Sequence, residues 1–314
     1  MSAGRLLVIY SPNSTNAVRF RRSVLPQLDR LDYDYDLLPI SDLPYFQAKQ
    51  KIQKAIKYND EILAAGGDGI VNVSLDAAIT SDKNVIFSVL ALGNFNDFAR
   101  SINGSVTKIE KINQAKTIDF YPLELSVNHH HLLYAAQYIS LGVTARLTDY
   151  LNSDQARALR KRLRRSNTLF GMISALNYNK IFRNLSDISL PPAIHDGKIV
   201  TDNSLGFMLG PIGHYFSPYE KSYHRDTSDF WFHHAKLTGH SARDVPYISS
   251  WFGRNLPGNE TDYEEFTFNS PTSIVCQIGG DKLDLDKVSN LSVQRSQKSI
   301  RLRAPRLTRK NRSA

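Results

Sequence analysis

The sequence predicts an α/β protein in two parts: a parallel sheet with helices on both faces, then a mainly antiparallel β-sandwich with a helical insert. Two observations predict this class. In the first part, short apolar runs alternate with segments of helical periodicity, as in a parallel sheet covered by helices. In the second part, strand-like runs follow one another directly, which favours antiparallel pairing. We expect a first domain at residues 1–115, a second at 116–304 with its insert at about 144–183, and a basic tail at 305–314.

The first domain divides into strand–helix units. Expected strands lie at residues 5–10, 33–38, 61–65 and 84–91, and expected helices at about 16–31, 44–58 and 71–78 and from 96 onward. Ligands of parallel sheets bind beyond the carboxyl ends of the strands. The loops at 11–15, 66–69 and 93–96 should therefore meet at one edge of the sheet.

The second domain is predicted from strands and turns. The polar run 128–131 should form a hairpin turn between strands at 119–127 and 132–140. Further strands are expected at residues 204–209, 230–234, 266–268, 273–278 and 299–302.

Composition limits the class of protein. The chain has 314 residues, 41% of them hydrophobic, and is long enough to bury a large core. A single cysteine, Cys276, excludes a disulfide framework within the chain and suits a reducing cytosol. The longest apolar stretch, Val85–Leu92, is far below spanning length, and no targeting segment is expected.

The net charge of +9 is concentrated in two places. One basic cluster lies within 157–165 and the other within 301–312. Each is either a solvated face or a surface that attracts anionic lipid. Nucleic acid is not expected as a partner, because no recognised nucleic-acid module accompanies the basic tail.

The segment with the most chemical content is the glycine loop after the third strand. It reads Gly66-Gly67-Asp68-Gly69 and leads straight into a helix. Glycines let the backbone approach an anion, and the helix N-terminus favours negative charge. An aspartate in such a loop can hold the Mg²⁺ that phosphates bring with them. The loop therefore predicts a polyphosphate site.

A second segment narrows the choice of family. Residues 92–100 read Leu-Gly-Asn-Phe-Asn-Asp-Phe-Ala-Arg. Together with the glycine loop, this segment resembles the two signature segments of the diacylglycerol kinase catalytic-domain family, which includes bacterial lipid kinases and sphingosine kinases. The glycine loop alone is shared with NAD kinases and phosphofructokinases. The resemblance implies a fold like that of NAD kinases and diacylglycerol kinases, with a nucleotide-binding first domain and a lipid-binding second domain.

The resemblance also implies site residues. The nucleotide would contact the glycine loop, the turn after the first strand and the 93–97 segment. These positions are Ser11, Asn13, Ser14, Thr15, Gly66, Gly67, Asp68, Gly69, Asn72, Gly93, Asn94, Asn96 and Asp97. Asp68 and Asp281 would be catalytic, with Asp281 in the place of the family's general base, and Asp226 would bind a structural Mg²⁺.

Some positions depart from the family pattern. Ile70 replaces the threonine after the glycine loop, and Val73 replaces a glutamate. Aspartate at position 281 is one methylene shorter than the family's glutamate. These departures leave open a homologue that binds nucleotide or lipid with impaired catalysis.

The function implied by the resemblance is phosphoryl transfer from ATP, with Mg²⁺, to a lipid hydroxyl. The enzyme would be cytoplasmic and peripheral to the inner face of the membrane, with its lipid acceptor at an anionic surface. A soluble-acceptor kinase such as an NAD kinase is the remaining alternative. The acceptor lipid and the oligomeric state, a homodimer included, stay open.

Overall fold

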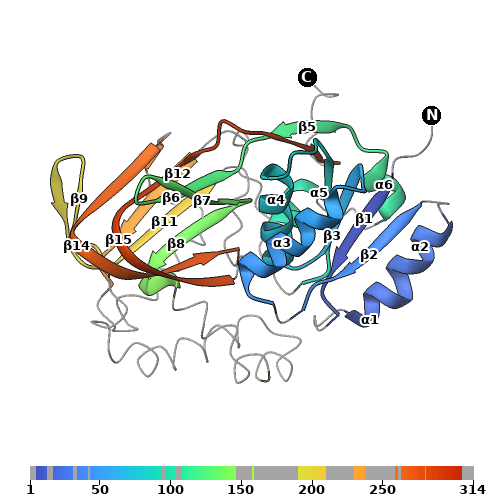
Figure 1. Ribbon diagram of the computed structural model, residues 1–314, viewed down its shortest axis with the longest axis horizontal. Helices are drawn as coiled ribbons and strands as arrows, with labels where there is room; N and C mark the ends of the chain where they lie inside the picture. Colours follow the sequence, from blue (N-terminus) through green and yellow to red (C-terminus); the bar gives the residue numbers. More distant parts are fainter. Residues whose placement is uncertain are drawn as a thin grey trace.

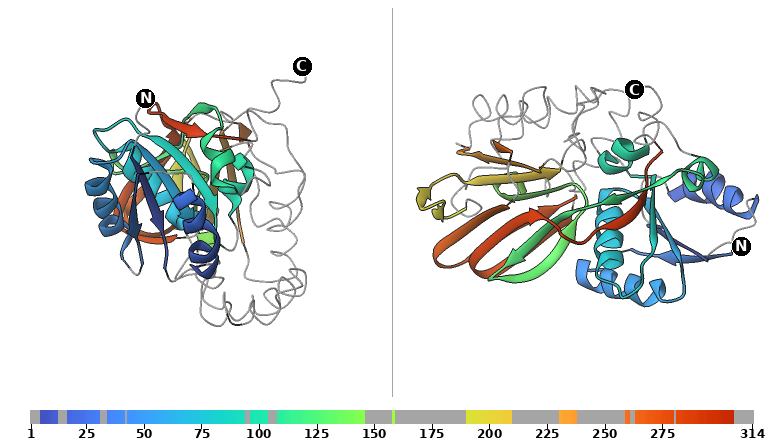
Figure 2. Two further views of the ribbon diagram at one scale, coloured as in Figure 1. Left: turned by 90° about the vertical axis from the view of Figure 1, so that its right-hand side faces the viewer. Right: turned by 90° about the horizontal axis from the view of Figure 1, so that it is seen from above.

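The computed structural model describes residues 5–12, 17–30, 34–41, 43–93, 96–103, 108–145, 158, 190–209, 230–237, 259–260, 263–279 and 281–305. Two sheets dominate it, one in each half of the elongated molecule (Figures 1 and 2). Among the described residues, none of the helices combines the length and apolar character needed to cross a bilayer.

The first sheet has six strands in the order β2-β1-β3-β4-β16-β5. Its parallel strands are β1 (Leu6–Tyr10), β2 (Tyr35–Pro39), β3 (Glu61–Gly66), β4 (Ile86–Ala91) and β16 (Ile300–Arg303), and β5 (Thr117–Phe120) is antiparallel to β16. The predicted parallel sheet is confirmed. Strand β16 was expected in the second half but lies instead between β4 and β5, so the end of the chain completes the first sheet.

Helices cover both faces of this sheet, as predicted. One face carries α3 (Tyr45–Ile56), α4 (Asp68–Ile79) and α5 (Asp97–Asn103), and the other carries α1 (Ala17–Arg19), the π-helix η1 (Phe20–Val24), α2 (Leu25–Arg30) and α6 (Ile109–Asn113). Alternate residues of β1 show the division. Leu7 and Ile9 join the core cluster under α3 and α4, whereas Leu6 and Val8 join the cluster under η1, α2 and α6.

The second sheet has ten strands and pairs antiparallel throughout. Its strands are β6 (Leu123–Val127), β7 (His130–Ala135), β8 (Tyr138–Gly142), β9 (Ala193–His195), β10 (Lys198–Val200), β11 (Ser204–Leu209), β12 (Phe230–Ala235), β13 (Asn259–Glu260), β14 (Tyr263–Ile278) and β15 (Asp281–Arg295). The expected hairpin forms at Asn128 and His129, both with positive φ. Nearly all of the predicted helical insert lies outside the described residues.

Several strand boundaries differ from expectation, and prolines mark two of them. The single strand predicted at 119–127 divides at Pro122 into β5 and β6, which belong to different sheets. The two strands predicted at 266–268 and 273–278 are one strand, β14, whose pairing shifts register between Thr267 and Thr272, where Pro271 stands. Proline cannot donate to a ladder, so a bulge accommodates it.

Candidate active site

The glycine loop has the predicted geometry. Strand β3 ends at Gly66 and helix α4 begins at Asp68, with Gly67 as an extended N-cap residue that offers no side-chain cap. A Cβ built on Gly66 would lie 2.7 Å from the Cβ of Ile70, so only glycine fits there. Because no side chain caps its first turn, the twelve-residue helix α4 presents its backbone N–H groups and positive dipole end at this loop.

The second loop packs directly on the first. The Gly66 carbonyl accepts hydrogen bonds from the backbone N–H groups of Leu92 (3.0 Å) and Gly93 (3.1 Å). A Cβ built on Gly93 would lie 2.2 Å from the Cα of Gly67. The two loops therefore meet backbone to backbone at the carboxyl ends of the neighbouring strands β3 and β4.

Asn96 shapes the second loop. It adopts a left-handed conformation with φ of 54°, which asparagine tolerates better than most residues. Its side chain accepts from the Gly93 N–H and donates to the Gly93 carbonyl, each at 2.6 Å. Both ends of its amide group therefore hold the loop together, and the expected contact of Asn96 with a nucleotide stays a prediction.

Asp68 joins the two loops. Its side chain is largely buried, with 8% exposed, and its Oδ1 accepts a hydrogen bond from the backbone N–H of Phe98 at 3.3 Å. Phe98 lies in the first turn of α5. The Asp68 carboxylate therefore lies at the start of α4 and reaches the start of α5, where helix dipoles favour negative charge.

Asp281 arrives from the second sheet. It is the first residue of β15, and a Cβ built on Gly69 would lie 2.8 Å from both of its carboxylate oxygens. Burial, together with the charge of Asp68, raises the pKa of Asp281 to about 6. Two residues earlier, Gly279 has a φ of +52° and lies against Asn72 and the Asp68 carbonyl. The β14–β15 turn therefore rests on the glycine loop.

Asn72 lies beneath this turn and is fully buried. Its Nδ2 donates to the Asp68 carbonyl at 2.8 Å, and its Oδ1 accepts from the backbone N–H of Ala136 at 2.7 Å. Asn72 was also expected at the nucleotide; in the structure its amide group binds two backbone groups of the protein.

The other expected site residues divide into two groups. Ser11 follows β1, next to the carboxyl end of β3, and Asp97 is the first residue of α5. Outside the described residues lie Asn13, Ser14, Thr15, Asn94 and Asp226, and the Asp97 side chain is not described either.

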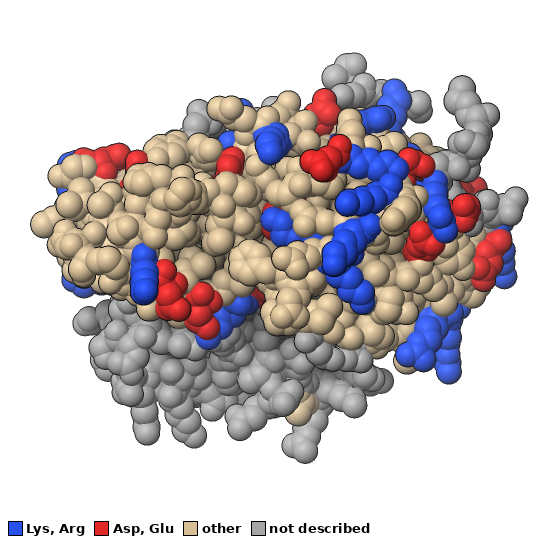
Figure 3. Space-filling view, in the orientation of Figure 1, with Lys and Arg blue, Asp and Glu red and all other residues tan. Residues whose placement is uncertain are grey.

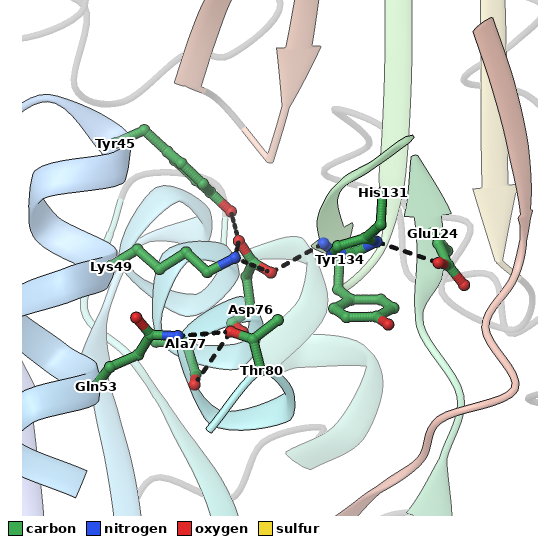
Figure 4. A network of polar contacts seen from close by, with 9 residues as sticks. All are labelled: Tyr45, Lys49, Gln53, Asp76, Ala77, Thr80, Glu124, His131 and Tyr134. Atoms are coloured by element: carbon green, nitrogen blue, oxygen red, sulfur yellow. Dashed lines mark hydrogen bonds and ion pairs between the residues drawn. The ribbon is translucent and has the colours of Figure 1, made fainter. Parts of the chain in front are cut away.

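A buried ion pair, which was not expected from the sequence, lies behind the glycine loop (Figure 4). Asp76, on α4, is fully buried and lies 2.9 Å from Lys49 Nζ of α3. It also accepts from the Tyr45 hydroxyl at 3.1 Å and from the Tyr134 backbone N–H at 3.0 Å. Burial raises the pKa of Asp76, and the Lys49 ammonium opposes that effect. One signal was available: Asp76 lies between Leu75 and Ala77 in an otherwise apolar stretch.

The donor set fits a phosphate with a hard cation. Backbone N–H groups at the start of α4 suit phosphate oxygens. Mg²⁺ is commonly held by one or two carboxylates together with phosphates and water, and Asp68 supplies such a carboxylate at the start of α4. Among the described residues, no group of three or more His, Cys, Asp or Glu side chains could form a metal site by itself.

Comparison with known proteins agrees with this arrangement. Residues 5–123 match the family model of the diacylglycerol kinase catalytic domain. No curated protein matches the sequence.

Solved structures share the whole fold. A diacylglycerol kinase from Bacillus anthracis str. Sterne is 14% identical, with a TM-score of 0.61 over 98% of this chain and 99% of that one. An NAD kinase from Archaeoglobus fulgidus in complex with ATP is 12% identical, with a TM-score of 0.52 over 98% and 96%. At these identities the likeness concerns the fold alone. The family model carries the assignment: residues 5–123 match the model of the diacylglycerol kinase catalytic domain, which supports a kinase of this family, as the two signature-like segments predicted.

Proposed function

We propose that this protein is an ATP- and Mg²⁺-dependent lipid kinase that transfers the γ-phosphoryl group of ATP to a lipid hydroxyl. The contact between Asp281 and Gly69 carries the proposal. It sets a carboxylate from the second sheet against the loop best suited to phosphate. A group that accepts the proton of an acceptor alcohol has to lie this close to the phosphate that the alcohol attacks.

Each side chain has a definite task in this proposal. The start of α4 binds phosphate oxygens, and Asp68 would hold Mg²⁺, which neutralises phosphate charge when bound. Asp281 accepts the proton of the acceptor hydroxyl. The acceptor oxygen forms a bond to the γ-phosphorus while the bond from that phosphorus to the leaving ADP oxygen breaks. A pKa of about 6 leaves Asp281 mostly ionised at pH 7 and basic enough to take the proton.

The acceptor is proposed to be a lipid in an anionic membrane, met by the enzyme at the cytoplasmic face. Most residues of the two basic clusters lie outside the described ranges. Arg303, which is described, forms an ion pair with Glu61 at 2.7 Å. Helix α3 and the residue after it add exposed lysines, Lys51, Lys54 and Lys57. In Figure 3, Lys and Arg side chains gather over the half of the molecule that contains α3. Such a surface is attracted to anionic lipid.

Transfer of radiolabel from ATP tests the proposal. Purified protein with Mg²⁺, labelled ATP and vesicles containing a panel of lipid alcohols should yield labelled lipid. Because the fold is shared with an NAD kinase, NAD without vesicles is the comparison acceptor. Label in NAD alone would replace the lipid assignment with a soluble-acceptor kinase. ATP binding without transfer to any acceptor would indicate impaired catalysis, for which Ile70 in the glycine loop is the first suspect.

A further inference from the structure

One face of α4 binds the edge of the second sheet through two side chains. Asn72 and Asp76 lie one turn apart and therefore on the same face of the helix. Asn72 Oδ1 accepts from the Ala136 N–H (2.7 Å), and Asp76 Oδ1 accepts from the Tyr134 N–H (3.0 Å). Among the described strands β7 stands last in its sheet, so the Tyr134 N–H belongs to an edge, and Ala136 follows that strand directly. Helix α4 supplies the acceptors that a further strand would otherwise provide.

The same helix face also contacts both parts of the candidate active site. Asn72 Nδ2 donates to the Asp68 carbonyl at 2.8 Å, which ties the side chain to the glycine loop. A Cβ built on Gly279 would lie 1.5 Å from that nitrogen, so the turn leading to Asp281 rests on Asn72. One buried amide group thus touches the glycine loop, the residue after β7 and the turn before Asp281.

Asp76 extends this arrangement to α3. Its carboxylate receives Lys49 Nζ and the Tyr45 hydroxyl from α3 and the Tyr134 N–H from β7 (Figure 4). All these partners lie in the interior or at its border: the Asp76 side chain is fully buried and that of Lys49 is 13% exposed. A carboxylate held by this many partners has one position, and it fixes the direction of α4 relative to β7.

We propose that Asn72 and Asp76 are positioning residues that set the separation between Asp68 and Asp281 without touching a ligand. The inference rests on the proposed kinase function. It assigns Asn72 a role other than nucleotide contact, because its fully buried amide donates to one backbone group and accepts from another. Asparagine suits this position because it offers a donor and an acceptor in one short, uncharged side chain.

Kinetics with two variants and a matched control test the inference. Asn72→Ala should lower kcat about tenfold or more and leave the KM for ATP within about twofold, since misplacement of reacting groups acts on the chemical step. Asn59→Ala is the control, because Asn59 is also buried and also donates to a backbone carbonyl, that of Ala55, but within the first domain alone. It should keep kcat.

Two double variants at Asp76 and Lys49 test the inference if Asn72→Ala does not fold. Asp76→Asn combined with Lys49→Met removes both charges and retains an acceptor for Tyr134. It should keep most of kcat, whereas Asp76→Ala with Lys49→Met, which lacks the acceptor, should lose it. Weaker ATP binding by Asn72→Ala at unchanged kcat would make Asn72 a nucleotide ligand and overturn the inference. Equal kcat in the two Asp76 combinations would also overturn it.

Hydrogen exchange separates failure of this inference from failure of the kinase proposal. If the wild type phosphorylates no acceptor, the kinase proposal fails, but exchange can still be measured. Asn72→Ala should speed amide exchange in peptides covering Tyr134 to Ala136 and the turn at Gly279, relative to Asn59→Ala. Unchanged exchange in both peptides would show that Asn72 does not couple the sheets.

Discussion

Gly67 and Gly93, from the ends of neighbouring parallel strands, pack backbone against backbone: a Cβ on residue 93 would lie 2.2 Å from the Cα of residue 67. This contact joins the two segments that resemble the kinase signatures. Position 93 requires glycine because a side chain would not fit against Gly67. The φ of Gly93 lies outside the left-handed region, so backbone conformation is not the reason.

Gly93→Ala should separate the two loops. The added methyl group meets backbone rather than a flexible side chain, so we expect a loss of roughly 1–3 kcal/mol in the free energy of unfolding. ATP affinity should fall as the loops move apart. Thermal unfolding and calorimetric titration with ATP measure the two effects.

Gly197→Ala is the matched control for that variant. Gly197 has a φ of +71° but nothing within 4 Å of an added Cβ, and it lies between β9 and β10. Alanine there should cost about 1–2 kcal/mol of stability through its left-handed conformation and leave ATP binding intact. Equal ATP affinity in both variants would contradict a role for the Gly67–Gly93 contact in nucleotide binding.

The pH dependence of catalysis should report Asp281. Its pKa is raised to about 6 by burial and by the charge of Asp68, and only the ionised form can accept a proton. We expect kcat/KM to fall as pH drops through about 6, with a slope of one proton. Rates between pH 5 and 8 in buffers of constant ionic strength measure the limb. A rate that stays level down to pH 5 would exclude Asp281, with this pKa, as the base.

Asp281→Asn should stabilise the fold at neutral pH while abolishing activity. The pKa of Asp281 is about 6 in the folded state and 3.8 in the reference state, so the folded protein binds this proton more tightly. The stabilisation of the folded state by this proton is complete below pH 3.8 and is lost as pH rises through 6.

Asparagine cannot ionise, so Asp281→Asn avoids the loss of folding stability that ionisation of Asp281 causes. This loss amounts to at most about 3 kcal/mol at pH 7. Melting curves at pH 5 and pH 7 should show a larger gain for Asp281→Asn at pH 7. A lower melting temperature than the wild type at pH 7 would mean that the carboxylate has stabilising partners in the folded state.

Lys49→Met should destabilise the protein. The substitution leaves Asp76 buried without its cation, and breaking one side of a buried pair costs about 3–5 kcal/mol. The cost should shrink in acid, because burial already raises the pKa of Asp76 and a protonated carboxyl needs no counter-charge. Denaturant unfolding at pH 7 and pH 5 measures both values. Adding Asp76→Asn to Lys49→Met should restore much of the stability, and its failure to do so would point to lost packing by the Lys49 stem.

The parts of the fold with strong local patterns were predictable. Apolar runs such as Leu6–Tyr10 and the glycine loop at Gly66 identify strands and a turn by composition alone. Strand β15 was not expected, because Asp, Lys and Asn recur along it and are uncommon in strands. Pairing with β14 and β6 compensates for the poor strand preference of these residues. This pairing could not be read from the local sequence of β15.

The candidate site was predictable in its loops and less so in its side chains. Asp68, Asp281 and the glycines, which the family resemblance singled out, lie together in the structure. The tasks of Asn72 and Asn96 could not be predicted, because an asparagine that binds a ligand and one that binds backbone look the same in a sequence. The return of β16 to the first sheet depends on a partner strand, β4, more than 200 residues earlier.

The most direct test of the central claim, that the joined loops and Asp281 form a phosphoryl-transfer site, is the turnover of Asp68→Asn. This variant keeps the size of the side chain and an acceptor for the Phe98 N–H and removes the charge. Label transfer from ATP to lipid should fall at least about a hundredfold while the protein stays folded. Transfer at the wild-type rate would show that the Asp68 carboxylate takes no part in phosphoryl transfer.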